Sequence, residues 1–140
     1  MDTKQISGKF DVKLTPSNAY ATGVNGVALG RMTLDKTFYG ELEARSQGEM
    51  LSAMTAVKGS AGYVAIEQVV GSLCGRQGSF VLQHFGIMTD GQHRLILEVV
   101  PHSGAGELQG LTGTMAINIE NGQHFYEFQF GFETSTEPEF

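Results

Sequence analysis

Residues 62–101 read GYVAIEQVVGSLCGRQGSFVLQHFGIMTDGQHRLILEVVP, and this stretch decides the fold. Three alternating runs, residues 63–73, 79–88 and 94–100, are separated by glycine-containing turn signals, which predicts three antiparallel β-strands. Successive side chains of a strand point to opposite faces of the sheet. The lengths of the two turns therefore determine which side chains share a face.

The first turn is predicted at residues 76–77. It would place Glu67 opposite Gly86. By the same register, Val69 would lie opposite His84.

The second turn is predicted at Asp90-Gly91, a two-residue hairpin signal. It would place His84 opposite Leu97. Both turns give one common face, made of Tyr63, Ala65, Glu67, Val69, Leu73, Phe80, Leu82, His84, Met88, Leu95, Leu97 and Val99. An acid and an imidazole on an otherwise apolar face indicate a pocket.

The rest of the chain continues in the same pattern. Further strands are predicted over residues 8–14, 27–38, 42–56, 115–120 and 124–132. Residues 16–26 are interpreted as a loop, residues 104–113 as a glycine-spaced turn, and residues 133–140 as an acidic, frayed tail.

Two further turns bear on register. Asn121-Gly122 is a strong hairpin signal and predicts Ile117 opposite Tyr126. The turn at Tyr39-Gly40 is ambiguous.

The turn could be two or three residues long, and the choice flips the third strand, residues 42–56. A two-residue turn would place Lys36 opposite Glu43, and a three-residue turn would bring Phe38 together with Leu42.

About eight antiparallel strands with no convincing helical period predict an all-β fold. An open sheet would leave two long edges, and closing it into a barrel removes them. We therefore predict an eight-stranded antiparallel barrel, with a two-sheet sandwich as the alternative. Eight strands enclose an interior wide enough for side chains or one small ligand.

Composition limits the classes of function. The 140 residues fit one domain, residues 1–140, with an ordered core over about 8–132. A net charge of −6 with nine basic residues argues against a nucleic-acid partner. A single cysteine excludes an internal disulfide, and neither a signal peptide nor an apolar membrane span is recognisable, so we expect a cytoplasmic protein with no membrane partner.

Three segments resemble a bacterial family of small proteins annotated only as a domain of unknown function. They are GYVAIE at 62–67, GSFVLQH at 78–84 and GAGELQGLTG at 104–113. The resemblance runs from about Gly8 to Phe132 and implies a barrel like that of allene oxide cyclase, within the wider lipocalin-like shape. The third segment also resembles a glycine-spaced turn of the plant cyclase and of dirigent proteins. The family carries no established activity, and fold does not imply function.

Glu67 and His84 are the candidate catalytic residues. A carboxylate can orient an imidazole and stabilise its charged form, which leaves the second ring nitrogen to bind a ligand or move a proton. The structural alternative is a polar pair that fixes strand register. Tyr63 and Tyr126 join these two as candidate ligand-binding residues, although packing is the ordinary role of such tyrosines.

The sequence indicates neither a metal site nor a cofactor. The four histidines, His84, His93, His102 and His124, form no paired ligand motif. Cys74 has only Arg76 nearby to lower its pKa, which favours a structural or surface thiol over a nucleophile.

The face opposite His84 carries Gln68, Val70, Val81, Gln83, Phe85, Ile87, Arg94 and Ile96. It is too apolar for a fully solvated exterior, so we expect a homo-oligomer, most simply a two-fold dimer.

Two classes of function remain open, and a third is structural. The chain is predicted to bind a small apolar or amphipathic molecule inside the barrel. The alternatives are a cofactor-free isomerase or cyclase that uses Glu67 and His84, and a structural dimer with a filled barrel. The sequence lacks a recognisable set of nucleophile, base and orienting residue, which favours binding over catalysis.

Overall fold

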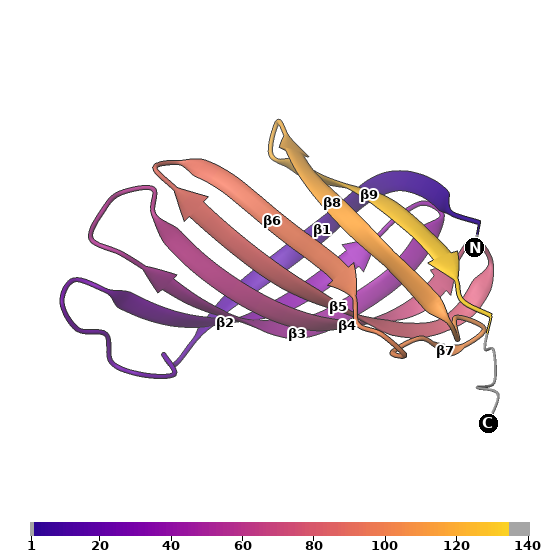
Figure 1. The fold of residues 1–140 in the computed structure, drawn as a ribbon, viewed down its shortest axis with the longest axis horizontal. Helices are drawn as coiled ribbons and strands as arrows, with labels where there is room; N and C mark the ends of the chain where they lie inside the picture. The colour runs from indigo at the N-terminus through magenta and orange to yellow at the C-terminus, as the bar shows by residue number, and fades with distance from the viewer. Residues whose placement is uncertain (1, 135–140) are drawn as a thin grey trace, which may run out of the picture.

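A computed structural model describes residues 2–134 of the chain, and these residues form β-strands joined by turns and loops (Figure 1). The strands are β1 (Lys4–Ser17), β2 (Ala28–Phe38), β3 (Leu42–Met54), β4 (Ala61–Leu73), β5 (Arg76–Thr89), β6 (Gln92–Val99), β7 (Ala105–Gly106), β8 (Leu111–Glu120) and β9 (Gln123–Phe132). Within this range there is no helix, and so none long and apolar enough to cross a membrane. Most of the tail expected over residues 133–140 lies outside the described residues.

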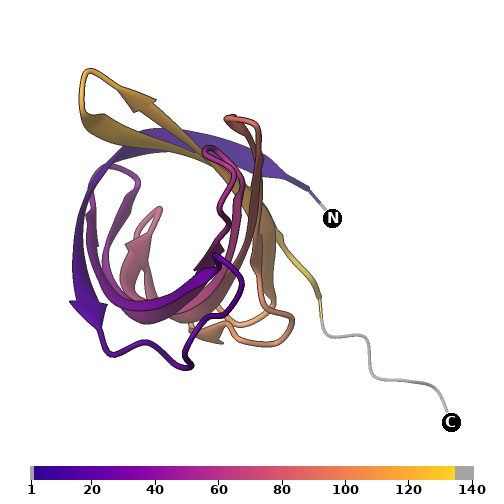
Figure 2. The ribbon, with the colours of Figure 1, turned by 90° about the vertical axis from the view of Figure 1, so that its left-hand side faces the viewer.

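Eight of the strands close into an antiparallel barrel. The order around the barrel is β4-β3-β2-β1-β9-β8-β6-β5, and pairing of β4 with β5 closes it. Figure 2 views the barrel from one end and shows the strands as a ring. The all-β, eight-stranded barrel predicted from the sequence is confirmed, and the two-sheet sandwich is excluded.

The closure is uneven around the ring. β6 and β8 share a single bridged pair, Glu98 with Thr114, whereas other neighbouring strands pair over seven residues or more. The two-residue β7 is an extra strand, which pairs with β5 at Gly78 and Ser79. The seam between β6 and β8 is therefore the weakest join of the barrel.

Two predicted hairpin registers are confirmed. At Asp90-Gly91 the two φ angles are 49° and 82°, and His84 lies opposite Leu97. At Asn121-Gly122 they are 51° and 78°, and Ile117 lies opposite Tyr126. Asn, Asp and Gly tolerate these positive φ angles, which two-residue hairpins require.

The predicted register between β4 and β5 is wrong. The turn is Cys74-Gly75, with φ angles of 49° and 83°, and not residues 76–77. Cysteine at positive φ is an uncommon turn residue, so this turn gave no signal.

The correction moves every partner across these two strands by four residues. Glu67 lies opposite Leu82 instead of Gly86, and Val69 lies opposite Phe80 instead of His84. Because the shift is an even number of residues, the predicted inward face is unchanged.

The connection between β2 and β3 decides which side chains of β3 face inward. Three residues, 39–41, join the strands, and Lys36 lies opposite Ser46. Neither register considered from the sequence is the observed one, although the three-residue turn gives the correct inward face. The loop predicted over residues 16–26 also begins later, because Pro16 and Ser17 continue β1.

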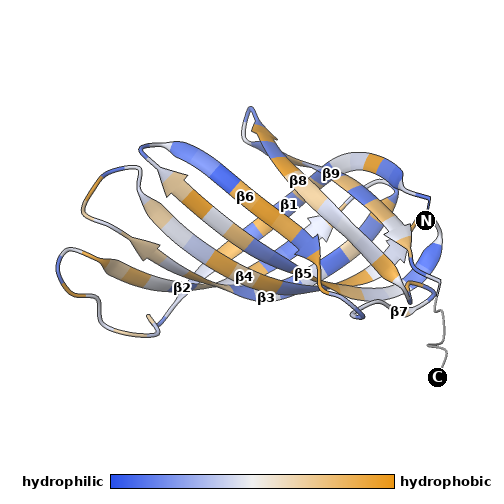
Figure 3. Cartoon of the chain, in the orientation of Figure 1, coloured by the Kyte–Doolittle hydropathy of each residue, from blue (hydrophilic) through white to orange (hydrophobic). Residues whose placement is uncertain are grey.

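The barrel interior has a filled half and an open half. Aromatic and leucine side chains pack the filled half, and Leu108 and Leu111 from the glycine-spaced segment are buried with them. Apolar and polar residues alternate along parts of the strands (Figure 3), and most of the buried side chains are apolar. The open half contains the site described next.

Candidate functional site

A cavity of about 530 Å³ occupies the open half of the barrel. It is lined by Phe10, Val12, Leu14, Leu34, Lys36, Met50, Tyr63, His84, His93, Leu95, Met115, Ala116, Ile117, Asn118, Ile119 and His124. A larger depression of about 840 Å³ lies on the outside of the barrel, beside Tyr20 and the exposed Arg31–Glu49 ion pair. We take the inner cavity as the candidate site because buried ionisable groups lie against it.

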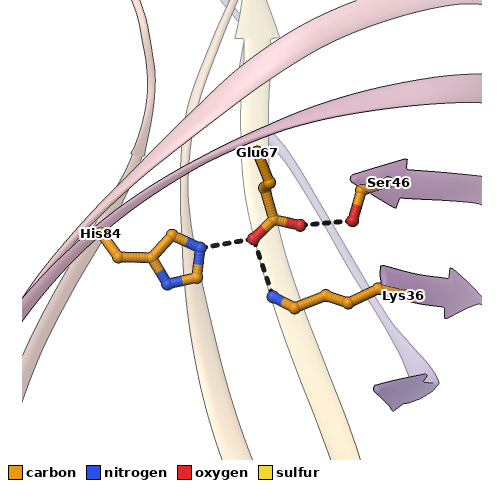
Figure 4. Close-up of polar contacts among 4 residues, drawn as sticks. All are labelled: Lys36, Ser46, Glu67 and His84. Atoms are coloured by element: carbon orange, nitrogen blue, oxygen red, sulfur yellow. Dashed lines mark hydrogen bonds and ion pairs between the residues drawn. The ribbon is translucent and has the colours of Figure 1, made fainter. Parts of the chain in front are cut away.

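Four polar side chains meet at the boundary between the filled half and the cavity (Figure 4). Lys36, Ser46, Glu67 and His84 come from β2, β3, β4 and β5, which are neighbouring strands of the barrel. Each is at most 4% exposed, and Glu67 is fully buried. We call these four residues the interior polar cluster.

Glu67 is the centre of the interior polar cluster. Lys36 Nζ donates to Glu67 Oε2 at 2.8 Å, and Ser46 Oγ donates to Oε1 at 2.6 Å. His84 Nε2 makes a short hydrogen bond with the same Oε2. Both carboxylate oxygens are therefore satisfied by neighbouring side chains.

The cluster keeps Glu67 ionised. Burial by itself opposes the charged carboxylate and would raise its pKa. The hydrogen bond from His84 and the charge of Lys36 outweigh burial and lower the pKa of Glu67 to about 2. The anion is thus held in place as the partner of Lys36 and His84.

The backbone of β3 makes room for this carboxylate. Gly48 lies opposite Glu67, and a Cβ atom there would stand 2.6 Å from Glu67 Cα and 2.0 Å from the carbonyl oxygen of Ile66. A side chain at position 48 would push β3 and β4 apart. Glycine is therefore a steric requirement of the site.

The expected contact between Glu67 and His84 is present, but the two candidate tyrosines are separated. Tyr63 lines the cavity, and its ring stacks on His93 with centroids 6.3 Å apart. Tyr126 is 1% exposed in the filled half, donates its hydroxyl hydrogen to the carbonyl oxygen of Tyr39 at 2.8 Å and is not among the cavity-lining residues. The ring of Tyr63 also occupies the space over Gly86, where a Cβ atom would be only 2.2 Å from it.

Lys36 and Ser46 were missed as site residues. A lysine in an alternating strand is ordinarily assigned to the solvent face, and the undecided turn at Tyr39-Gly40 left the direction of Ser46 open. The available signal for Lys36 was alternation, because it shares one face of its strand with the apolar residues Leu34 and Phe38.

The remaining histidines and the cysteine form no further cluster. Within residues 2–134, no group of three His, Cys, Asp or Glu side chains is arranged to hold a metal ion. His124 packs against the ring of Phe10 with centroids 5.2 Å apart. Burial raises the pKa of the Cys74 thiol, which lies in the turn between β4 and β5.

Comparisons with known proteins identify relatives of unknown function. No curated protein matches the chain. A crystal structure of a protein of unknown function from the DUF3224 family of Shewanella oneidensis MR-1 is 85% identical and has a TM-score of 0.93. The similarity covers 96% of this chain and 100% of that one. The family model described as "Protein of unknown function (DUF3224)" matches residues 6–130, so the chain belongs to the DUF3224 family.

Proposed function

We propose that this protein binds a small apolar or amphipathic molecule in the open half of the barrel. The observation that carries the proposal is the cavity of about 530 Å³ that ends on the interior polar cluster. Ligand sites of this size are usually apolar, with a few polar groups that fix orientation. Aliphatic, methionine and aromatic side chains supply the apolar wall here, and Lys36 and His84 supply the polar end.

The cavity also weighs against a purely structural barrel. A filled barrel would extend its side-chain packing along its whole length, as the aromatic residues do in the other half. Here the interior polar cluster lies between the packed half of the barrel and the cavity. Such a cluster carries a desolvation cost that an apolar core would avoid.

The test is to identify molecules retained by the purified protein. Native mass spectrometry and untargeted analysis of the released material should find one class of small molecule on the wild-type chain. Ile117→Trp adds bulk to a half-buried cavity wall and should lower retention strongly. Gln129→Trp adds the same bulk to an outward position of β9 and should leave retention unchanged. Equal retention by the two variants would place the molecule elsewhere.

A second candidate is a cofactor-free isomerase or cyclase. It is favoured by the hydrogen bond that orients His84 against Glu67, because the second ring nitrogen could then transfer a proton. Turnover of the retained molecule by wild-type protein, lost in His84→Gln, would support this candidate over simple binding. A cytoplasmic location also remains a prediction from the sequence.

A further inference from the structure

We propose that the ligand of the cavity is an anion, with a carboxylate on an apolar body, whose head group is held by Lys36 and His84. This inference rests on the proposed binding function and adds the chemical class of the ligand. The ionisable side chains of the cavity wall support an anionic ligand. Among the lining residues the ionisable side chains are one lysine, three histidines and one tyrosine, and none is a carboxylic acid.

Lys36 has hydrogen-bonding capacity left for a ligand. An ammonium group has three donors, and within residues 2–134 its only hydrogen bond is the one to Glu67. The rings of Phe10 and Phe38 lie 5.0 Å and 5.8 Å from Nζ. These rings favour the positive charge but accept no ordinary hydrogen bond. A ligand oxygen in the cavity would therefore complete the shell of a buried ammonium group.

His84 presents a second polar atom. Its Nε2 is bound to Glu67, and its Nδ1 lies on the side of the ring that points away from Glu67 (Figure 4). In the part of the chain that the structure describes, Nδ1 makes no hydrogen bond and is not among the fully buried polar atoms, and the ring lines the cavity. Nδ1 is therefore available to a ligand.

Glu67 positions these two donors and does not bind the ligand itself. Its oxygens already accept from Lys36, Ser46 and His84, and it is absent from the cavity wall. It neutralises one positive charge. A bound anion is balanced when His84 carries a proton on both nitrogens, so that two cations face two anions.

This charge balance predicts that an anion binds more tightly when His84 is protonated. Protonated His84 donates from Nδ1, whereas the lone pair of a neutral Nδ1 repels an anion. The titratable groups that contact His84 or share its cavity are Glu67 on β4, Lys36 on β2, Tyr63 on β4, His93 on β6 and His124 on β9.

The experiment compares three probes with one hydrocarbon chain, namely octanoate, octanol and octylamine. Each is titrated into the wild-type protein, and binding is followed by NMR at the methyl groups of the cavity wall. We expect octanoate to bind about tenfold more tightly than octanol, because charge-assisted hydrogen bonds are the stronger kind, and octylamine to bind most weakly. The preference for octanoate should increase as the pH is lowered within the range in which octanoate stays ionised.

Three variants locate the effect. Lys36→Met/Glu67→Gln removes both charges of the buried ion pair together and should bind octanol as before, with no preference for octanoate. His84→Gln should remove the pH dependence, while His93→Gln should retain it. If His93→Gln abolishes it and His84→Gln does not, the assignment to His84 is wrong.

The outcomes separate this inference from the proposed function. If octanol or octylamine binds as tightly as octanoate, the inference that the ligand is an anion is wrong, whereas the proposal that the cavity binds a small molecule still stands. If none of the three probes shifts the cavity-wall methyl groups, both proposals fail. The wild-type ranking decides the question even if the double variant does not fold.

Discussion

Glu67 holds a buried ammonium, a buried imidazole and a hydroxyl group in one place, and its removal affects all three. Breaking one side of a buried ion pair is costly because the other charge stays buried without a partner. We expect Glu67→Gln to lower the free energy of unfolding by about 3 kcal/mol, measured by urea denaturation at neutral pH.

The matched control is Lys36→Met/Glu67→Gln, which removes both charges. It should recover most of the loss and come within about 1 kcal/mol of the wild type. A double variant as unstable as Glu67→Gln would mean that Lys36 is not the group destabilised by the single change.

The interior polar cluster also predicts acid sensitivity. The pKa of Glu67 is about 2 in the folded chain, below the ordinary value of 4.5. A lowered folded pKa contributes stability above the unfolded value, and this stability is lost as the pH falls through the folded value. The difference corresponds to roughly 3 kcal/mol, lost between about pH 4.5 and pH 2.

The measurement is urea denaturation across that pH range. Other carboxylates titrate there as well, so the comparison is with Lys36→Met/Glu67→Gln, whose stability should fall less steeply. Parallel curves for the two proteins would refute the assignment of acid sensitivity to Glu67.

At the scale of single residues, the sequence identified half of the interior polar cluster. Glu67 and His84 were found because they interrupt an apolar face, and apolar faces are read from alternation. Lys36 was not found, because a lysine is ordinarily assigned to the solvent face. Ser46 was not found, because its direction depended on a three-residue turn whose register the sequence left open. The ligand-binding roles of Tyr63 and Tyr126 stay predictions, and their rings lie in different halves of the barrel.

At the scale of the strands, the close approach of β3 and β4 at Gly48 determines whether the site forms. Gly48→Ala would set Cβ 2.0 Å from a backbone oxygen, so the strands must separate. We expect a loss of about 2 kcal/mol in unfolding free energy, together with changed NMR shifts of the His84 ring.

Gly62→Ala on β4 is the matched control for this strand. Its new Cβ would meet the Ile87 Cδ1 atom at 3.5 Å, an ordinary contact, and its φ angle is not positive. Stability should therefore stay within about 0.5 kcal/mol of the wild type or rise slightly. Equal losses for both alanines would argue that the approach at Gly48 is not tight.

The sequence predicted the strands but not the register between β4 and β5, because the turn that joins them lacks the usual turn residues. Asp90-Gly91 and Asn121-Gly122 combine residues that tolerate positive φ, and both registers were correct. The turn at Cys74-Gly75 needs the same backbone but places cysteine where Asn or Asp is usual. The predicted inward face is still correct, because the register differs by an even number of residues. Glu67 and His84 therefore point into the barrel as expected.

At the scale of the whole molecule, the outer face of β3 to β6 is unusually apolar for a solvated surface. Leu51, Val64, Ile66, Phe85 and Ile96 are each between 38% and 54% exposed. We propose that a second copy covers this face about a two-fold axis, since one apolar patch then covers its own equivalent.

Sedimentation at micromolar concentration should report a dimer for the wild-type chain. Ile96→Glu should dissociate it, and Val24→Glu, in the loop between β1 and β2, should not. A wild-type monomer would remove the proposal. The likeness to allene oxide cyclase likewise stays a prediction, whereas the barrel and the family are established.

The pairing of β1 with β9 has a consequence for how the protein is made. β1 pairs with β9 from Lys4–Phe130 to Phe10–His124, so the barrel cannot close until the residues of β9 have left the ribosome. Until then β1 offers an unpaired edge, as does each strand that emerges last. Such edges recruit other strands, and contacts so distant in sequence form slowly. We therefore expect aggregation to compete with folding until β9 pairs with the β1 edge.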